Sequence, residues 1–167
     1  MDNRIGGYID TLISCVNVRK KKYAIYWDKQ EDKESEGNFT FMQHEFDHKP
    51  TLEEIKSVII SWYNAKIDNE ILTGFVWKGM SVWLSTENQF NYKAAYDLCV
   101  QNGGQTLPVL FKFGDTENPI YHQFTTQEEL SDFYIKAMQF ISDTLSAGWI
   151  MKDTVDWNQY EECLKTI

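Results

Sequence analysis

The chain has 167 residues, and its 25 acidic residues outnumber its 16 Lys and Arg residues, which gives a formal net charge of −9. This charge repels nucleic-acid phosphates and anionic membrane surfaces, so we expect neither as a partner. Hydrophobic residues make up 43% of the chain and aromatic residues 15%. This apolar content is sufficient for a folded core and argues against disorder.

The N-terminal segment lacks the basic region and continuous apolar stretch of a signal peptide, so we expect no secretion. No segment approaches the roughly 20 apolar residues of a transmembrane helix. Cys15, Cys99 and Cys163 are far apart and have no C-x-x-C spacing, which predicts reduced thiols rather than a metal or redox site. These features favour the cytoplasm, or a particle assembled there.

Near the N-terminus, apolar residues recur at spacings of three and four, which predicts a short amphipathic helix. This stripe consists of Ile5, Tyr8, Ile9, Leu12, Ile13 and Val16. About three turns of helix are marginally stable alone. The helix is therefore expected to dock either on the core of its own domain or on a partner subunit.

Residues 23–27 and 39–46 are rich in aromatic and apolar side chains and are expected to form an antiparallel strand pair. A charged loop over residues 28–37 joins them. Together with the helical arm, this pair forms an expected N-terminal unit of residues 1–49. The remaining residues, 50–167, form the expected core.

The core begins with a predicted helix that starts at Thr51, where Thr51 and Glu54 have the spacing of a capping box, and that runs to about Lys66. Two short apolar runs follow, at residues 73–77 and 80–84. The Lys78-Gly79 dipeptide between them predicts a tight hairpin, because Gly adopts positive φ at no steric cost. Trp77, beside this turn, is expected to be partly exposed.

Further elements follow in chain order. A capping box from Thr86 to Gln89 predicts a second helix, and residues 107–113 and 120–124 predict a second strand pair. A third capping box, from Thr126 to Glu129, opens a long helix that residues 146–148 are expected to end. A last short helix is expected at residues 157–164. The fold class is therefore α+β, a single compact domain of short antiparallel strand pairs packed with amphipathic helices.

The cluster of His44, Asp47 and His48 is the only group of metal-capable side chains in the sequence. On a strand, the two histidines would lie about 13 Å apart, which is too far for one ion. The chain has no nucleophile elbow, phosphate-binding loop or dinucleotide fingerprint. We therefore expect no catalytic residue, no metal and no cofactor, and a protein that is not an enzyme.

The hairpin with its Lys78-Gly79 turn, followed by a helix start at Glu87-Asn88-Gln89, resembles a family of bacteriophage and prophage proteins of unknown function. The resemblance covers about residues 51–157 and continues through residues 107–108, 112–114, 124–125 and 145–157. Members are typically encoded near tail or tail-fibre genes. The resemblance implies a virion component or assembly factor and brings no catalytic residues with it.

The expected function is thus that of a non-enzymatic phage structural or assembly protein, located in the virion or in the cytoplasm of the host bacterium. Its expected partners are other phage or virion proteins, and self-association is left open. The arm and the hairpin provide the expected contact surface, which consists of Ile5, Tyr8, Ile9, Leu12, Trp77, Lys78 and Met80. One alternative is a module that binds glycan or peptide through exposed aromatic side chains. Another is a metal-dependent hydrolase that uses His44, Asp47 and His48.

Overall fold

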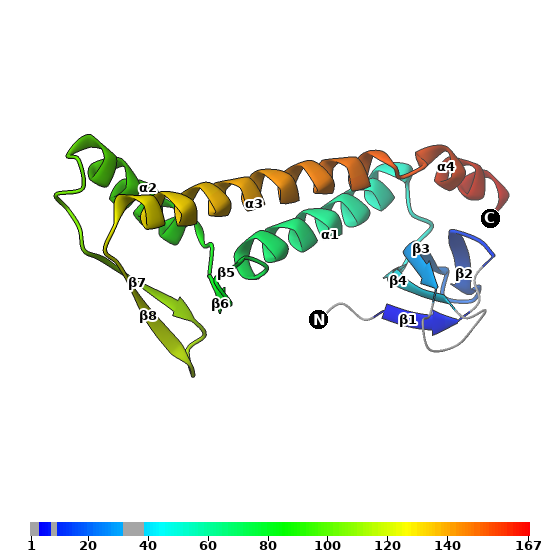
Figure 1. Cartoon of the computed structure of the whole chain (residues 1–167). Coiled ribbons are helices and arrows are strands. Elements are labelled where there is room, and N and C mark those ends of the chain that lie inside the picture. Colours follow the sequence, from blue (N-terminus) through cyan, green and yellow to red (C-terminus); the bar gives the residue numbers. More distant parts are fainter. Residues whose placement is uncertain (1–3, 8–9, 32–38) are drawn as a thin grey trace. The chain divides into compact units, whose positions relative to one another are not determined.

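The computed structural model describes residues 4–7, 10–31 and 39–167, and it has the expected α+β fold (Figure 1). Within these ranges there are four helices, and all of the strand pairs are antiparallel. None of the helices in the described ranges is long and apolar enough to cross a membrane.

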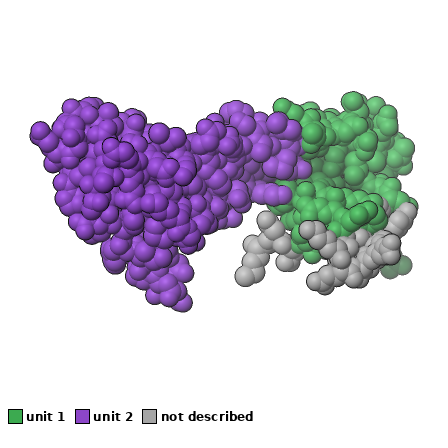
Figure 2. All heavy atoms as spheres, in the orientation of Figure 1, with its two compact units in different colours: residues 1–62, 152–167 green, residues 63–151 purple. Residues whose placement is uncertain are grey.

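The chain divides into two compact units, residues 1–62 with 152–167 and residues 63–151 (Figure 2). Both boundaries fall inside long helices, α1 (Leu52–Thr73) and α3 (Gln127–Asp153). The division therefore differs from the one expected between residues 49 and 50. The first turns of α1 belong with the N-terminal sheet, because Trp62 of α1 packs edge-on against Trp27 with their rings 6.0 Å apart.

The first unit is built on a four-stranded antiparallel sheet with the order β1-β4-β3-β2. Its strands are β1 (Arg4–Gly7), β2 (Ile13–Asn17), β3 (Lys22–Glu31) and β4 (Phe39–Phe46). The predicted pairing of β3 with β4 is confirmed, with Tyr23 opposite Phe46 and Trp27 opposite Met42. Helix α4 (Trp157–Thr166) confirms the predicted last helix, and its Tyr160 hydroxyl donates a hydrogen bond of 2.7 Å to the Tyr26 carbonyl.

The predicted N-terminal helical arm is wrong, because the described part of this segment forms two strands. Ile5 lies in β1 opposite Phe41, and Ile13 lies in β2 opposite Ile25. Leu12 is half-buried just before β2, whereas residues 8–9 lie outside the described residues. Gly6 and Gly7 weaken a helix, and the strand backbone instead finds partners in β4 and β3. Pairing with distant strands outweighs the local helical periodicity.

The second unit holds two hairpins, the C-terminal half of α1, all of α2 and most of α3. Its elements are the end of α1, β5 (Val76–Trp77), β6 (Met80–Ser81), α2 (Thr86–Gln101), β7 (Val109–Gly114), β8 (Pro119–Phe124) and α3 up to residue 151. Its buried core consists of Ile67, Ile71, Phe75, Trp77, Val82, Leu84, Tyr92, Cys99, Phe113, Phe124, Leu130, Phe133 and Ala137. Burial raises the pKa of Tyr92 to about 12, because a phenolate is poorly solvated in this core.

Both predicted hairpins of this unit are confirmed. Lys78 and Gly79 have φ values of 48° and 78°, as a tight turn between β5 and β6 requires. In the second hairpin, β7 pairs with β8 over its whole length, from Val109 opposite Phe124 to Gly114 opposite Pro119. One face of this hairpin carries Phe113 and Phe124 into the core.

The two long helices extend beyond their predicted ends. Helix α1 continues past Lys66 to Thr73, and α3 passes through residues 146–148 to Asp153. Gly148 does not end α3. Its lack of a side chain instead allows this helix to approach α1 closely. A Cβ atom on Gly148 would overlap the side chain of Ile67. Here glycine serves helix packing rather than helix termination.

The predicted helix starts are correct to within a residue. At α1, Thr51 N donates to Glu54 Oε2 at 2.8 Å and Glu54 N donates to Thr51 Oγ1 at 3.3 Å, which confirms the capping box. At α2, the residue that caps the helix is Ser85 rather than Thr86, and its side chain accepts from Asn88 N.

Candidate functional site

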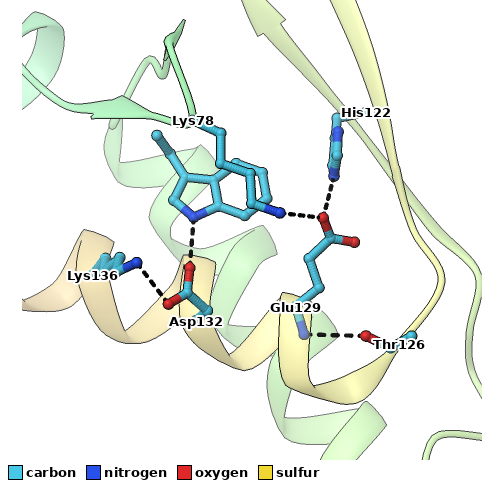
Figure 3. A network of polar contacts seen from close by, with 7 residues as sticks. Lys78, His122, Thr126, Glu129, Asp132 and Lys136 are labelled. Atoms are coloured by element: carbon cyan, nitrogen blue, oxygen red, sulfur yellow. Dashed lines mark hydrogen bonds and ion pairs between the residues drawn. The ribbon is translucent and has the colours of Figure 1, made fainter.

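Trp77 is buried, contrary to the prediction that it is partly exposed. Only 2% of the residue is exposed, and its ring packs against those of Phe124 and Phe133, each with centroids 5.3 Å away. Its indole Nε1 donates to Asp132 Oδ2 at 3.0 Å (Figure 3). Met80, also expected in a contact surface, is half-buried against the same core. Of the three hairpin residues expected in the contact surface, Trp77, Lys78 and Met80, Lys78 alone is exposed.

Lys78, at the β5–β6 turn, bonds to the first turn of α3. Its Nζ donates to Glu129 Oε1 at 2.7 Å, and His122 Nε2 of β8 lies 3.2 Å from the same oxygen (Figure 3). The predicted capping box at α3 is only half formed. Glu129 N donates to Thr126 Oγ1 at 3.3 Å, while the Glu129 carboxylate turns toward Lys78 and His122.

The carboxylates of this network are held in their ionised form. The hydrogen bond from Lys78 is the main cause that lowers the pKa of Glu129, against the opposing effect of burial. The pKa of Asp132 is lowered as well, first by the hydrogen bond from Lys136 and then by the one from Trp77. A general acid at neutral pH needs a raised pKa. These groups are therefore suited to fastening both hairpins to α3.

A cleft of about 630 Å³ lies in the second unit, and both hairpins contribute to its lining. It is lined by Thr73, Gly79, Ser81, Val82, Trp83, Asn88, Lys112, Gly114, Asp115, Thr116, Asn118 and Ile120. One wall comes from the β5–β6 hairpin and the start of α2, and the other from the β7–β8 hairpin. Because Glu129 bonds to Lys78 on one hairpin and His122 on the other, its carboxylate helps to fix the two walls relative to each other.

Trp83 is the large aromatic side chain of the cleft, and 49% of it is exposed. Its neighbours Val82 and Leu84 are buried, and their amides donate to the carbonyls of Phe75 and Leu72. The carbonyl of Trp83 accepts a hydrogen bond of 2.8 Å from Asn88 Nδ2. The backbone at Trp83 is therefore fixed on both sides.

The opposite wall is a tight turn built around Asp115. Asp115 Oδ1 accepts from the amides of Glu117 and Asn118, at 2.8 and 2.6 Å. Gly114 has a φ of 78°, and a Cβ there would overlap the Asn118 carbonyl, so only glycine fits. Lys112 completes this wall, and it makes no ion pair with any residue in the described ranges.

The residues of the predicted histidine cluster are exposed at the end of β4, and their side chains have separate partners. His48 Nε2 lies 3.0 Å from Glu54 Oε1, Asp47 pairs with Lys22, and His44 packs edge-on against Phe46. Within the described ranges, no three His, Cys, Asp or Glu residues are grouped so as to hold a metal ion.

Sequence reasoning missed His122, Glu129 and Asp132 as a network, because partners on separate elements leave no local pattern. The exposure of Trp83 did leave a signal. In residues 80–84, side chains alternate between faces, so Trp83 must point away from the side on which Val82 and Leu84 are buried.

Comparisons of the chain with protein-family models, curated proteins and solved structures gave no match.

Proposed function

We propose that this chain is a non-enzymatic structural or assembly protein of a bacteriophage or prophage. In this proposal it acts in the virion, its tail region or the cytoplasm of the host, through contacts with other virion proteins. The phage setting rests on the resemblance of residues 51–157. The contact role rests on one structural observation, an exposed apolar site near the end of α3.

This site consists of Trp149 and Ile150, which are 55% and 65% exposed. Gly148, the preceding residue, is buried against Ile67 of α1. Because consecutive helical residues point in different directions, the packing of Gly148 on α1 leaves the two large side chains outside this contact. Adjacent exposed Trp and Ile side chains give a protein partner an apolar surface to cover.

A protein partner fits this site better than a small ligand does. Trp is enriched among the residues that supply most of the binding energy at protein interfaces. The formal charge of −9 opposes the approach of a second copy, so we propose a different protein with an apolar pocket and a basic rim. The α3 site replaces the contact surface expected at Trp77 and Met80, which are largely occupied by core packing.

The network around Glu129 also supports a role without catalysis. Its carboxylates bond to Lys78, His122, Lys136 and the indole of Trp77, and the pKa of each carboxylate is lowered. Such groups stabilise a fold well but donate protons poorly at neutral pH.

A cross-linking pull-down from phage-producing cells tests the proposal. The tagged chain is expected to capture an identified virion or tail protein, and Trp149→Ala is expected to reduce that capture at least about tenfold, since Trp anchors commonly contribute 2 kcal/mol or more. Trp83→Ala is the matched control, because it removes a similarly exposed Trp from a different surface. Capture of no virion protein, or equal capture by Trp149→Ala, would overturn the proposal.

A further inference from the structure

The cleft that the two hairpins line has the composition of a binding site rather than of a packing defect. Five of its twelve lining residues have hydroxyl or amide side chains that form neutral hydrogen bonds, and these are Thr73, Ser81, Asn88, Thr116 and Asn118. Trp83 is the only aromatic residue among the twelve that line it. The cleft therefore offers one flat apolar surface surrounded by hydroxyl and amide groups.

The side chains that line the cleft carry no net formal charge. Lys112 is the single basic residue and Asp115 the single acidic residue of the cleft. The backbone amides of the turn bond to one oxygen of Asp115, and Lys112 makes no ion pair within the described part of the chain. A neutral ligand with many hydroxyl groups matches this lining, because hydroxyls can both accept from Lys112 and donate to a carboxylate.

Hydrogen bonds within the chain hold both walls of the cleft. The Trp83 backbone is fixed by Asn88 and by the amides of its two buried neighbours, and Asp115 fixes the opposite turn. Glu129 links the two hairpins through Lys78 and His122. Walls held in this way reduce the entropy that binding would otherwise lose.

We propose that this cleft binds a neutral saccharide, with one sugar ring stacked on the indole of Trp83 and its hydroxyls bonded to Lys112 and Asp115. The apolar C–H face of a sugar ring fits a Trp face, and its hydroxyls fit the hydroxyl and amide rim. A peptide side chain fits less well, because the buried core of a protein interface is mainly apolar. Besides Trp83, the lining includes only two large apolar residues, Val82 and Ile120, and Val82 is almost fully buried.

This proposal is independent of the phage assignment and uses a different surface from Trp149. A saccharide site and a protein-contact site can coexist on the second unit, so each can fail alone. The two Trp→Ala variants therefore serve as controls for each other.

Saturation-transfer NMR on the full chain tests the proposal with four neutral probes at millimolar concentration, maltohexaose, cellohexaose, mannohexaose and chitohexaose. We expect transfer to at least one probe. Trp83→Ala and Trp83→Leu should each weaken its binding at least about tenfold, the amount that loss of a stacked ring produces. Trp83→Phe should retain most of the affinity, and Trp149→Ala should leave it unchanged.

A second variant keeps the test decisive if Trp83 substitutions disturb folding. Lys112 is on the opposite wall, at an exposed position of β7, and it makes no ion pair with any described residue. The substitution Lys112→Gln should weaken saccharide binding about threefold or more. Transfer to none of the four probes would overturn the proposal. Binding that survives both Trp83→Leu and Lys112→Gln would also overturn it, as would Trp83-dependent binding of a peptide library with no sugar bound.

Discussion

Lys78 and His122 lie on different hairpins and meet at the same oxygen of Glu129, at distances of 2.7 and 3.2 Å. This shared carboxylate joins the β5–β6 turn and strand β8 to the first turn of α3. The two hairpins carry opposite walls of the cleft. A residue that sequence reasoning assigned to a helix cap therefore helps to set the geometry of the candidate binding site.

Glu129→Gln should lower the free energy of unfolding by about 1 kcal/mol. The substitution keeps the size of the side chain but removes the negative charge of the carboxylate to which Lys78 and His122 both bond. Urea unfolding at pH 7 measures the change. Glu128→Gln is the matched control, since Glu128 is exposed and adjacent, and its effect should stay within about 0.5 kcal/mol. Equal effects of the two substitutions would contradict the bridging role of Glu129.

Stability should fall in acid because the network carboxylates bind protons less readily in the folded state. The pKa values of Glu129 and Asp132 are lowered from ordinary values of 4.5 and 3.8, chiefly by hydrogen bonds from Lys78 and Lys136. Their contribution is complete above the unfolded pKa values and is lost as the pH falls through the folded ones. Urea unfolding between pH 7 and pH 3 should therefore show the difference between wild type and Glu129→Gln shrinking in acid. A difference that grows as the pH falls would contradict this assignment.

Trp77→Ala should cost about 3–5 kcal/mol, because it empties a site in the core of the second unit. Trp77→Phe should cost less, since it keeps an aromatic ring but loses the hydrogen bond to Asp132. Thermal unfolding measures both. Trp83→Ala and Trp149→Ala remove exposed rings and should each change stability by less than about 1 kcal/mol. A Trp77→Ala effect as small as theirs would show that Trp77 is not buried.

Gly148→Ala should destabilise the protein by about 1–3 kcal/mol through overpacking against Ile67, even though Ala is the better helix former. Chemical denaturation measures the change, and Ser146→Ala, at an exposed position of the same helix, should be nearly neutral. In an Ile67→Ala background, Gly148→Ala should cost much less. A stabilising effect of Gly148→Ala in the wild type would contradict the close packing of α1 and α3.

The sequence was most informative where local chemistry decides the structure. The Lys78-Gly79 turn, the Thr51 capping box and the strand pairs of residues 23–27 with 39–46 and 107–113 with 120–124 were all predictable. In each case the turn or cap residues and the apolar pattern favour the same structure. Such elements are predictable from the sequence because their local conformational preferences agree with their tertiary packing.

Prediction failed where a distant partner decides the structure. Ile5 and Ile13 fit a helical stripe, but pairing with β4 and β3 makes them strand residues. Gly148 has the local character of a helix stop, but Ile67 requires a residue without Cβ there. The alternation of side chains around Trp77 indicates that the hairpin has two faces, but it does not indicate which face is buried. In the structure, Phe124 and Phe133 pack against the face that carries Trp77.

Mass spectrometry of purified particles and their assembly intermediates tests the central claim most directly. Lysates of phage-producing cells would be fractionated by density, and the chain quantified in each fraction for the wild type, Trp149→Ala and Trp83→Ala. The account predicts that the wild type and Trp83→Ala co-fractionate with virion or tail proteins and that Trp149→Ala is depleted. Absence of the wild-type chain from mature particles and from every assembly intermediate would contradict the claim.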